Sequence, residues 1–152
     1  MAGPDPKLRI TRRHLPHWTL EGSAYFVTMR LRTRRLNEDE IRQILSHIVS
    51  GNGCFYELDA AVVMPDHVHL LLTPLEGYSL SRVMKGMKGT TARLLNLARH
   101  RCGSVWRDES FDRIIRRQKE FERRIHYMYL NPVKAGLTTD PDNYVGWHRK
   151  KG

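Results

Sequence analysis

Two histidines separated by a single valine, His67 and His69, are the residues of this sequence whose spacing most directly indicates chemistry. They begin an apolar segment that we expect to be a strand, and because side chains alternate along a strand, both imidazoles should lie on one face. Residues two apart on a strand are separated by about 6.6 Å, a span that two imidazoles can close over one metal ion. The pair by itself is equally compatible with two hydrogen-bonded histidines on a solvated sheet face.

A tyrosine and an asparagine four residues apart, Tyr127 and Asn131, form the second candidate pair. On a helix expected over residues 118–131 they share one face, with about 5 to 6 Å between their Cβ atoms. The apolar positions of this helix are Phe121, Ile125 and Met128. Pro132 disfavours helical geometry at Asn131, so we expect Asn131 at the helix end with its amide free to turn toward a ligand. The alternative is that Tyr127 packs beside the core and Asn131 caps the helix.

The apolar patterns of the whole chain predict the elements that must position these residues. Strands are expected at residues 24–32, 55–64, 67–73 and 110–116. Helices are expected between Asn37 and Gly51, from Ser79 to Ala98 and over residues 118–131. The order β-α-β-β-α-β-α indicates an α+β fold, and its first six elements match the ferredoxin-like arrangement, an antiparallel sheet with two helices on one face. The additional C-terminal helix carries the tyrosine.

Composition shifts at the two ends predict one domain with two basic extensions. We expect a basic N-terminal arm over residues 1–22, a catalytic domain over 23–138 and a basic C-terminal tail over 139–152. Within the second helix, Gly86 and Gly89 predict a bend or a close approach of another backbone. Cys54 and Cys102 have no metal-site or disulfide spacing, and we expect both to be packing thiols.

The charge of the chain indicates a polyanionic partner. Lys and Arg total 26 against 16 Asp and Glu, which gives a net charge of +10 and a pI near 10.1. No run of about 18 apolar residues could span a bilayer, and the first residues lack the apolar segment of a secretory signal. We therefore expect a cytoplasmic, nucleoid-associated protein.

Four segments together resemble the REP-associated tyrosine transposases, members of the single-tyrosine HUH group, over residues 25–137. They are Met64-Pro65-Asp66-His67-Val68-His69-Leu70-Leu71, Met84-Lys85-Gly86-Met87-Lys88, Trp106, and Tyr127-Met128-Tyr129-Leu130-Asn131-Pro132-Val133-Lys134-Ala135-Gly136-Leu137. The resemblance implies that His67, His69 and Asn131 bind Mg²⁺ or Mn²⁺ and that Tyr127 is the nucleophile. Tyr129 also falls in the last segment, but only Tyr127 has the i, i+4 relation to Asn131.

This set of residues suits transfer of a phosphodiester bond. A phenol with a pKa near 10 is a poor nucleophile at neutral pH, and its target phosphate is already negatively charged. A divalent ion would polarise the phosphate and neutralise charge that develops in the transition state. Attack would leave the 5′-phosphate on Tyr127 and a free 3′-hydroxyl, so the strand could be rejoined without ATP.

Basic residues across the chain are predicted to hold single-stranded or hairpin DNA. They are Arg12 and Arg13 in the arm, Arg82, Lys85 and Lys88 on the second helix, and Arg113, Arg116, Arg117, Arg123, Arg124 and Lys134 near the last strand and helix. The tail around Trp147 could help to clamp a hairpin. The resemblance implies a palindromic repeat as substrate, acted on by a monomer or a homodimer.

Two other functions fit the same pattern. A binding module for structured DNA or RNA could keep the fold without the chemistry, although a decayed nuclease would be expected to have lost one of its four site residues. A metal-dependent RNA nuclease would use the histidines to activate water and would not need Tyr127.

Overall fold

The computed structural model describes residues 22–151. Its elements are β1 (Ala24–Arg30), α1 (Glu38–Ser50), β2 (Tyr56–Val63), β3 (His67–Pro74), α2 (Leu80–Arg99), β4 (Phe111–Ile115), α3 (Gln118–Lys134), η2 (Pro141–Asn143) and β5 (Trp147–Arg149). The first seven follow the predicted order. Arg12, Arg13 and nearly all of the expected N-terminal arm lie outside the described residues.

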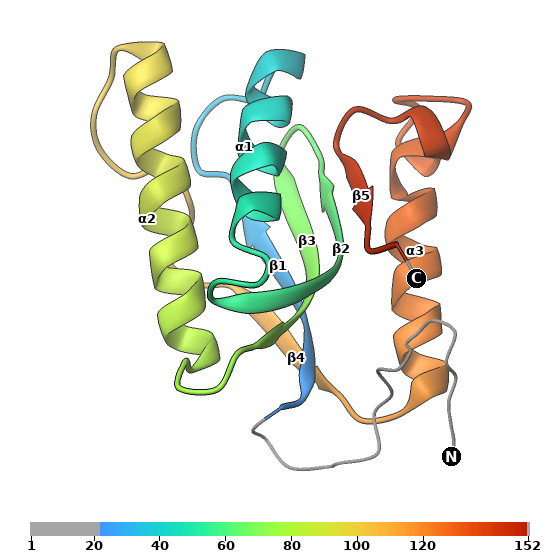
Figure 1. Cartoon of the computed structure of the whole chain (residues 1–152). Coiled ribbons are helices and arrows are strands. Elements are labelled where there is room, and N and C mark those ends of the chain that lie inside the picture. The colour runs from blue at the N-terminus through green and yellow to red at the C-terminus, as the bar shows by residue number, and fades with distance from the viewer. Residues whose placement is uncertain (1–21, 152) are drawn as a thin grey trace.

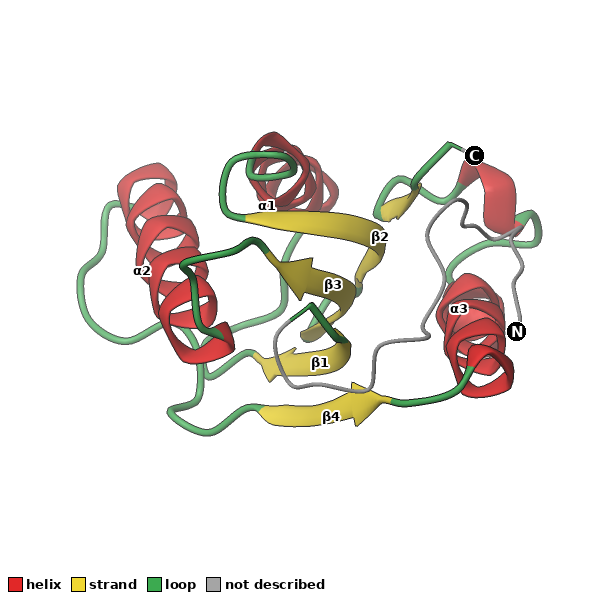
Figure 2. Ribbon diagram, turned by 60° about the horizontal axis from the view of Figure 1, so that its bottom comes forward, coloured by secondary structure: helices red, strands yellow, loops and turns green. Residues whose placement is uncertain are grey.

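The strands form one antiparallel sheet in the order β4-β1-β3-β2-β5. Helices α1 and α2 cover one face and α3 covers the other, which Figures 1 and 2 show from two directions. The α+β class is therefore confirmed. Strand β1 lies beside β3, and its register places Thr28 opposite His69 and Arg30 opposite His67. The two histidines are thus in the middle of the sheet rather than at an edge.

Side-chain alternation along the central strands separates two apolar cores. Val68 and Leu70 of β3 belong to the larger core, which lies beneath α1 and α2. Leu71 belongs to the smaller core, beneath α3, on the face where His69 also lies. The apolar stripe of α3 completes this second core with Phe121, Ile125 and Met128. Burial of that stripe fixes which side of α3 faces the sheet.

Caps and a buried ion pair hold α1 and α2 in place. Asn37 and Glu40 form a reciprocal capping box at the start of α1, with both hydrogen bonds at 2.9 Å. The same Glu40 carboxylate accepts two hydrogen bonds from Arg99 of α2, at 2.8 and 3.0 Å. Helix α2 is continuous from Leu80 to Arg99. Neither Gly86 nor Gly89 has another backbone close to where a Cβ would stand, so the predicted close approach is wrong.

Helix α3 extends past the residue where the sequence predicted its end. Pro132 lies inside the last turn and the helix ends at Lys134, so Asn131 is helical and not terminal. Proline removes a single helical hydrogen bond and restricts the preceding residue. Pro132 is buried against the fold, and the helix C-terminal to it has only two residues left, so the cost of continuing is small.

The segment expected to be a basic tail is part of the fold. It contains η2 and β5, and β5 pairs with the edge of β2. Gly146 allows this approach, because a Cβ there would collide with the carbonyl of Val63. Tyr144 is buried on the same side and donates to that carbonyl at 2.7 Å.

Two further properties concern the surface. Cys54 and Cys102 are both exposed, so the expectation that they are packing thiols is wrong. Both lie in turns or loops, where sequence alone does not reveal burial. Within residues 22–151, no helix combines the length and hydrophobicity needed to cross a bilayer.

Candidate active site

The two histidines of β3 stand together on the face that α3 covers. Their ring centroids are 4.7 Å apart. His69 is buried, with 5% of its surface exposed, whereas His67 is partly exposed toward the end of the sheet. The alternation predicted from the sequence therefore brings both imidazoles to one place.

Each imidazole is fixed through its Nδ1 atom. Asp66 contacts Nδ1 of His67 at 2.7 Å, and Thr28 of β1 contacts Nδ1 of His69 at 2.9 Å. Burial raises the pKa of Asp66, but its hydrogen bond with His67 and nearby positive charges outweigh burial and lower that pKa overall. An ionised carboxylate can only accept a hydrogen bond, so Nδ1 of His67 is the donor to Asp66. Its Nε2 lone pair is then available to a ligand.

Burial and positive neighbours keep His69 neutral. Desolvation lowers the pKa of His69 to about 3, with smaller contributions from His67, Arg30 and Arg124. A neutral imidazole has a free lone pair, which is the form that coordinates metal ions. His69 is therefore a competent metal ligand throughout the neutral pH range.

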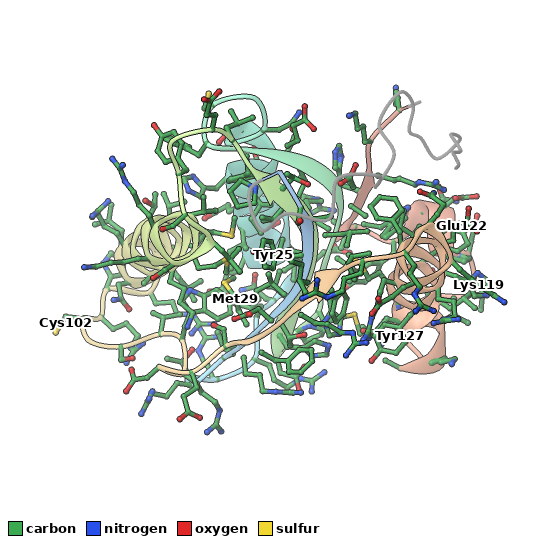
Figure 3. All side chains as sticks on the ribbon, turned by 90° about the horizontal axis from the view of Figure 1, so that it is seen from below. Tyr25, Met29, Cys102, Lys119, Glu122 and Tyr127 are labelled. Atoms are coloured by element: carbon green, nitrogen blue, oxygen red, sulfur yellow. The ribbon has the colours of Figure 1, made fainter. Side chains whose placement is uncertain are left out.

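Helix α3 delivers the tyrosine and the asparagine to these histidines. The rings of Tyr127 and His69 lie 5.5 Å apart, and the amide oxygen of Asn131 is 3.4 Å from Nε2 of His67. Tyr127 remains 42% exposed. Figure 3 shows it on the sheet side of α3, with Lys119 and Glu122 on the outer side. The four residues singled out from the sequence thus form one partly open cluster.

Phe26 of β1 links the members of this cluster. Its ring stacks on His69 at 5.2 Å and meets the edge of Tyr127 at 6.3 Å. The guanidinium of Arg124 lies over the same ring, 4.4 Å from its centroid. Phe26 itself is buried, with 2% of its surface exposed. The ring of Phe26 therefore forms an apolar surface beneath His69 and Tyr127, and the positive charge of Arg124 lies against that ring.

Sequence reasoning missed Thr28, Asp66 and Phe26. Asp66 adjoins His67 in the quoted motif, and its role as an orienting carboxylate could have been found there. The period of two in β1 places Phe26 and Thr28 on one face. Their contact with the histidines depends on the pairing of β1 with β3, which no local signal reveals.

The sheet separates the predicted DNA-binding residues into two groups. Arg82, Lys85 and Lys88 belong to α2, which lies on the opposite face of the sheet from α3 (Figure 2). The ammonium of Lys88 donates to the carbonyls of Arg107 and Asp108. The group near the site consists of Arg113, Arg116, Arg117, Arg123, Arg124 and Lys134. Arg113 forms an ion pair with Glu120, whereas Arg116, Arg117, Arg123 and Lys134 are exposed.

The donor set available to a metal is two imidazoles and one amide oxygen. Among residues 22–151 no three or more His, Cys, Asp or Glu side chains cluster in a way that could hold an ion. Asn131 is the third donor only because an amide oxygen is also a ligand for hard cations such as Mg²⁺ and Mn²⁺. The chemistry of these three donors suits a hard divalent ion, and two of them, Nε2 of His67 and the amide oxygen of Asn131, lie 3.4 Å apart.

Comparison with known proteins defines the class. The profile of the family described as "Transposase IS200 like" matches residues 25–119, which include both histidines and end before Tyr127. The chain belongs to this family. It is 31% identical over 124 residues to the REP-associated tyrosine transposase of Escherichia coli K12, covering 77% of this chain and 70% of that protein.

Two further comparisons agree in sequence and in fold. A putative REP-associated tyrosine transposase of Haemophilus influenzae is 27% identical over 144 residues, covering 85% of this chain and 82% of that one. The solved structure of a REP-associated tyrosine transposase bound to a REP hairpin superposes with a TM-score of 0.66 at 22% identity, covering 87% of this chain and 79% of that chain. The latter shows that the two proteins share a fold.

Proposed function

We propose that this chain is a metal-dependent single-stranded DNA endonuclease and strand transferase that acts on palindromic hairpin DNA through a 5′-phosphotyrosine intermediate. The proposal rests on two contacts between α3 and β3. Tyr127 lies beside His69, and Asn131 lies beside His67. Its relatives are named transposases, and the solved structure that shares its fold contains a REP hairpin.

In the proposed reaction the residues of this chain have distinct tasks. His67, His69 and Asn131 would hold Mg²⁺ or Mn²⁺, with Asp66 and Thr28 orienting the two imidazoles. When bound, the ion polarises the scissile phosphate and offsets its negative charge.

The phenolic oxygen of Tyr127 attacks the phosphorus, and the bond from phosphorus to the O3′ atom breaks. The phenolic proton is lost to solvent and O3′ takes a proton from solvent, so a 3′-hydroxyl leaves. The 5′-phosphate remains on Tyr127, and reversal with another 3′-hydroxyl rejoins the strand.

Adduct formation with a labelled DNA tests this proposal. The full chain is incubated with hairpins that carry randomised single-stranded flanks, with Mg²⁺, Mn²⁺ or a chelator, and separated under denaturing conditions. We expect a covalent protein–DNA band that needs the metal, is abolished by Tyr127→Phe and persists in Tyr129→Phe. Tyr129 is the matched control because its hydroxyl is hydrogen-bonded to Asp142 at 3.0 Å, away from the histidines.

Other outcomes distinguish the alternatives. Binding of hairpins without any cleavage would indicate a binding module. Cleavage of RNA that survives Tyr127→Phe, with no covalent band, would indicate a hydrolytic nuclease.

A further inference from the structure

Arg124 is a cation of α3 that lies beside the candidate site. It precedes Tyr127 by three residues, so the two side chains lie on neighbouring positions of one helix face. Its guanidinium rests 4.4 Å from the centroid of Phe26, the ring that also stacks on His69. These two observations put one positive charge at the edge of the site.

Arg124 is one of several arginines of the described fold that form no ion pair, although its charge also acts on Glu120, the partner of Arg113. Arg99 is buried and paired with Glu40, and Arg113 is paired with Glu120. Among residues 22–151, Arg124 has neither an ion-pair partner nor a hydrogen-bond partner. Its guanidinium lies over the ring of Phe26, and its N–H groups have no acceptor among the described residues. Those groups suit two oxygens of one phosphate.

We infer that Arg124 is a catalytic residue that binds the non-bridging oxygens of the scissile phosphate, with Phe26 as the platform that orients its guanidinium. This rests on the proposed function. During attack by Tyr127, negative charge grows on the non-bridging oxygens while the bond to O3′ breaks. A guanidinium fixed before the reaction stabilises that charge without reorganising. Arg124 therefore complements the ion held by the histidines and Asn131.

A purely structural role is the alternative, because an arginine stem can simply cover an apolar ring. Arg124→Met removes the charge but supplies an unbranched apolar side chain that can cover Phe26, whereas Arg124→Gln removes the charge and leaves a shorter polar side chain. Arg124→Lys keeps the charge but loses the planar pair of donors. Lys119→Gln is the matched control, since Lys119 is exposed on the outer side of the same helix (Figure 3).

The decisive measurement is the single-turnover rate of adduct formation at saturating hairpin DNA. We expect Arg124→Met and Arg124→Gln to lower it about 100-fold, the usual effect of losing one preorganised donor, and Arg124→Lys to recover only part of it. Lys119→Gln should keep the rate. Equal rates in Arg124→Met and the unsubstituted protein would show that Arg124 only packs on Phe26 and would overturn the inference.

A binding experiment keeps this inference separate from the proposed function. If no covalent adduct forms in any variant, the phosphotyrosine proposal fails, but a phosphate contact can still be measured. In chelator, loss of Arg124 should reduce the slope of log K against log salt for a single strand by about 0.7. An unchanged slope would contradict phosphate binding by Arg124 whatever the outcome of the adduct assay.

Discussion

Each histidine of the site is held through Nδ1, and this leaves Nε2 as the atom that can meet a ligand. Asp66 and Thr28 come from different strands, yet both serve the same purpose. Fixing a ring before an ion arrives reduces the conformational entropy lost on binding. The orientation of both imidazoles is therefore set before any ligand binds, as the proposed metal site requires.

Burial of neutral His69 predicts a pH dependence of folding in the metal-free protein. Its pKa is lowered to about 3 from an ordinary value of 6.5, so between these values the unfolded chain binds a proton that the folded chain does not. Stability should therefore fall as pH falls below 6.5, with a contribution of at most about 1.4 kcal/mol per pH unit.

Urea denaturation between pH 4 and 6.5 compares the unsubstituted protein with His69→Gln, and this range lies within the window set by the two pKa values. The variant should lose stability less steeply on acidification. His47 and His148, whose pKa values burial also lowers, remain in both proteins and cancel in the comparison. If stability falls equally with pH in the two proteins, His69 takes up its proton in the folded state as readily as in the unfolded chain, which would contradict the prediction.

Among the helices, α3 carries Tyr127 and Asn131, whereas α1 and α2 pack against the opposite face of the sheet. The link between α1 and α2 is the ion pair of Glu40 and Arg99, whose side chains are 6% and 4% exposed. The Arg99 hydrogen bond is the largest influence on the pKa of Glu40, which is lowered from 4.5 despite burial. Breaking a buried pair leaves an unpaired charge behind.

Arg99→Met should therefore destabilise the fold by about 3 kcal/mol at neutral pH. The deficit should shrink as pH falls below 4.5, because protonation of Glu40 removes the pairing from the unsubstituted protein as well. Denaturation by urea followed by circular dichroism measures both effects. Arg42→Met is the control, since Arg42 makes only exposed pairs worth about 0.5 kcal/mol on α1. Equal losses in the two variants would refute this assignment.

Local patterns in the sequence reveal much of the fold but not the contacts between elements. The apolar alternation that identifies β3 also places His67 and His69 on one face. Strand β5 escapes prediction because three residues, Trp147–Arg149, are too few to show a pattern. Arg124 could be recognised as basic from the sequence. Its place over Phe26 depends on how α3 packs on β1, which local periodicity does not contain.

At the scale of the whole molecule, the sheet divides the positive charge between two faces. The basic residues of α2 belong to the helix on one side of the sheet, whereas those of α3 belong to the helix on the other side, which carries Tyr127 (Figure 1). Charge patterns in a sequence predict that a polyanion binds but not on which face. A hairpin that contacts both groups would have to pass around an edge of the sheet.

Mapping of the covalent link tests most directly whether Tyr127, carried by α3, is the nucleophile that meets the proposed metal site on the sheet. The adduct is trapped with hairpin DNA, trimmed by nuclease and protease, and fragmented in a mass spectrometer. We predict that the added mass is a phosphate or nucleotide on Tyr127, joined through the 5′ end of the DNA. Attachment to Tyr129, to another residue, or through the 3′ end would contradict the account.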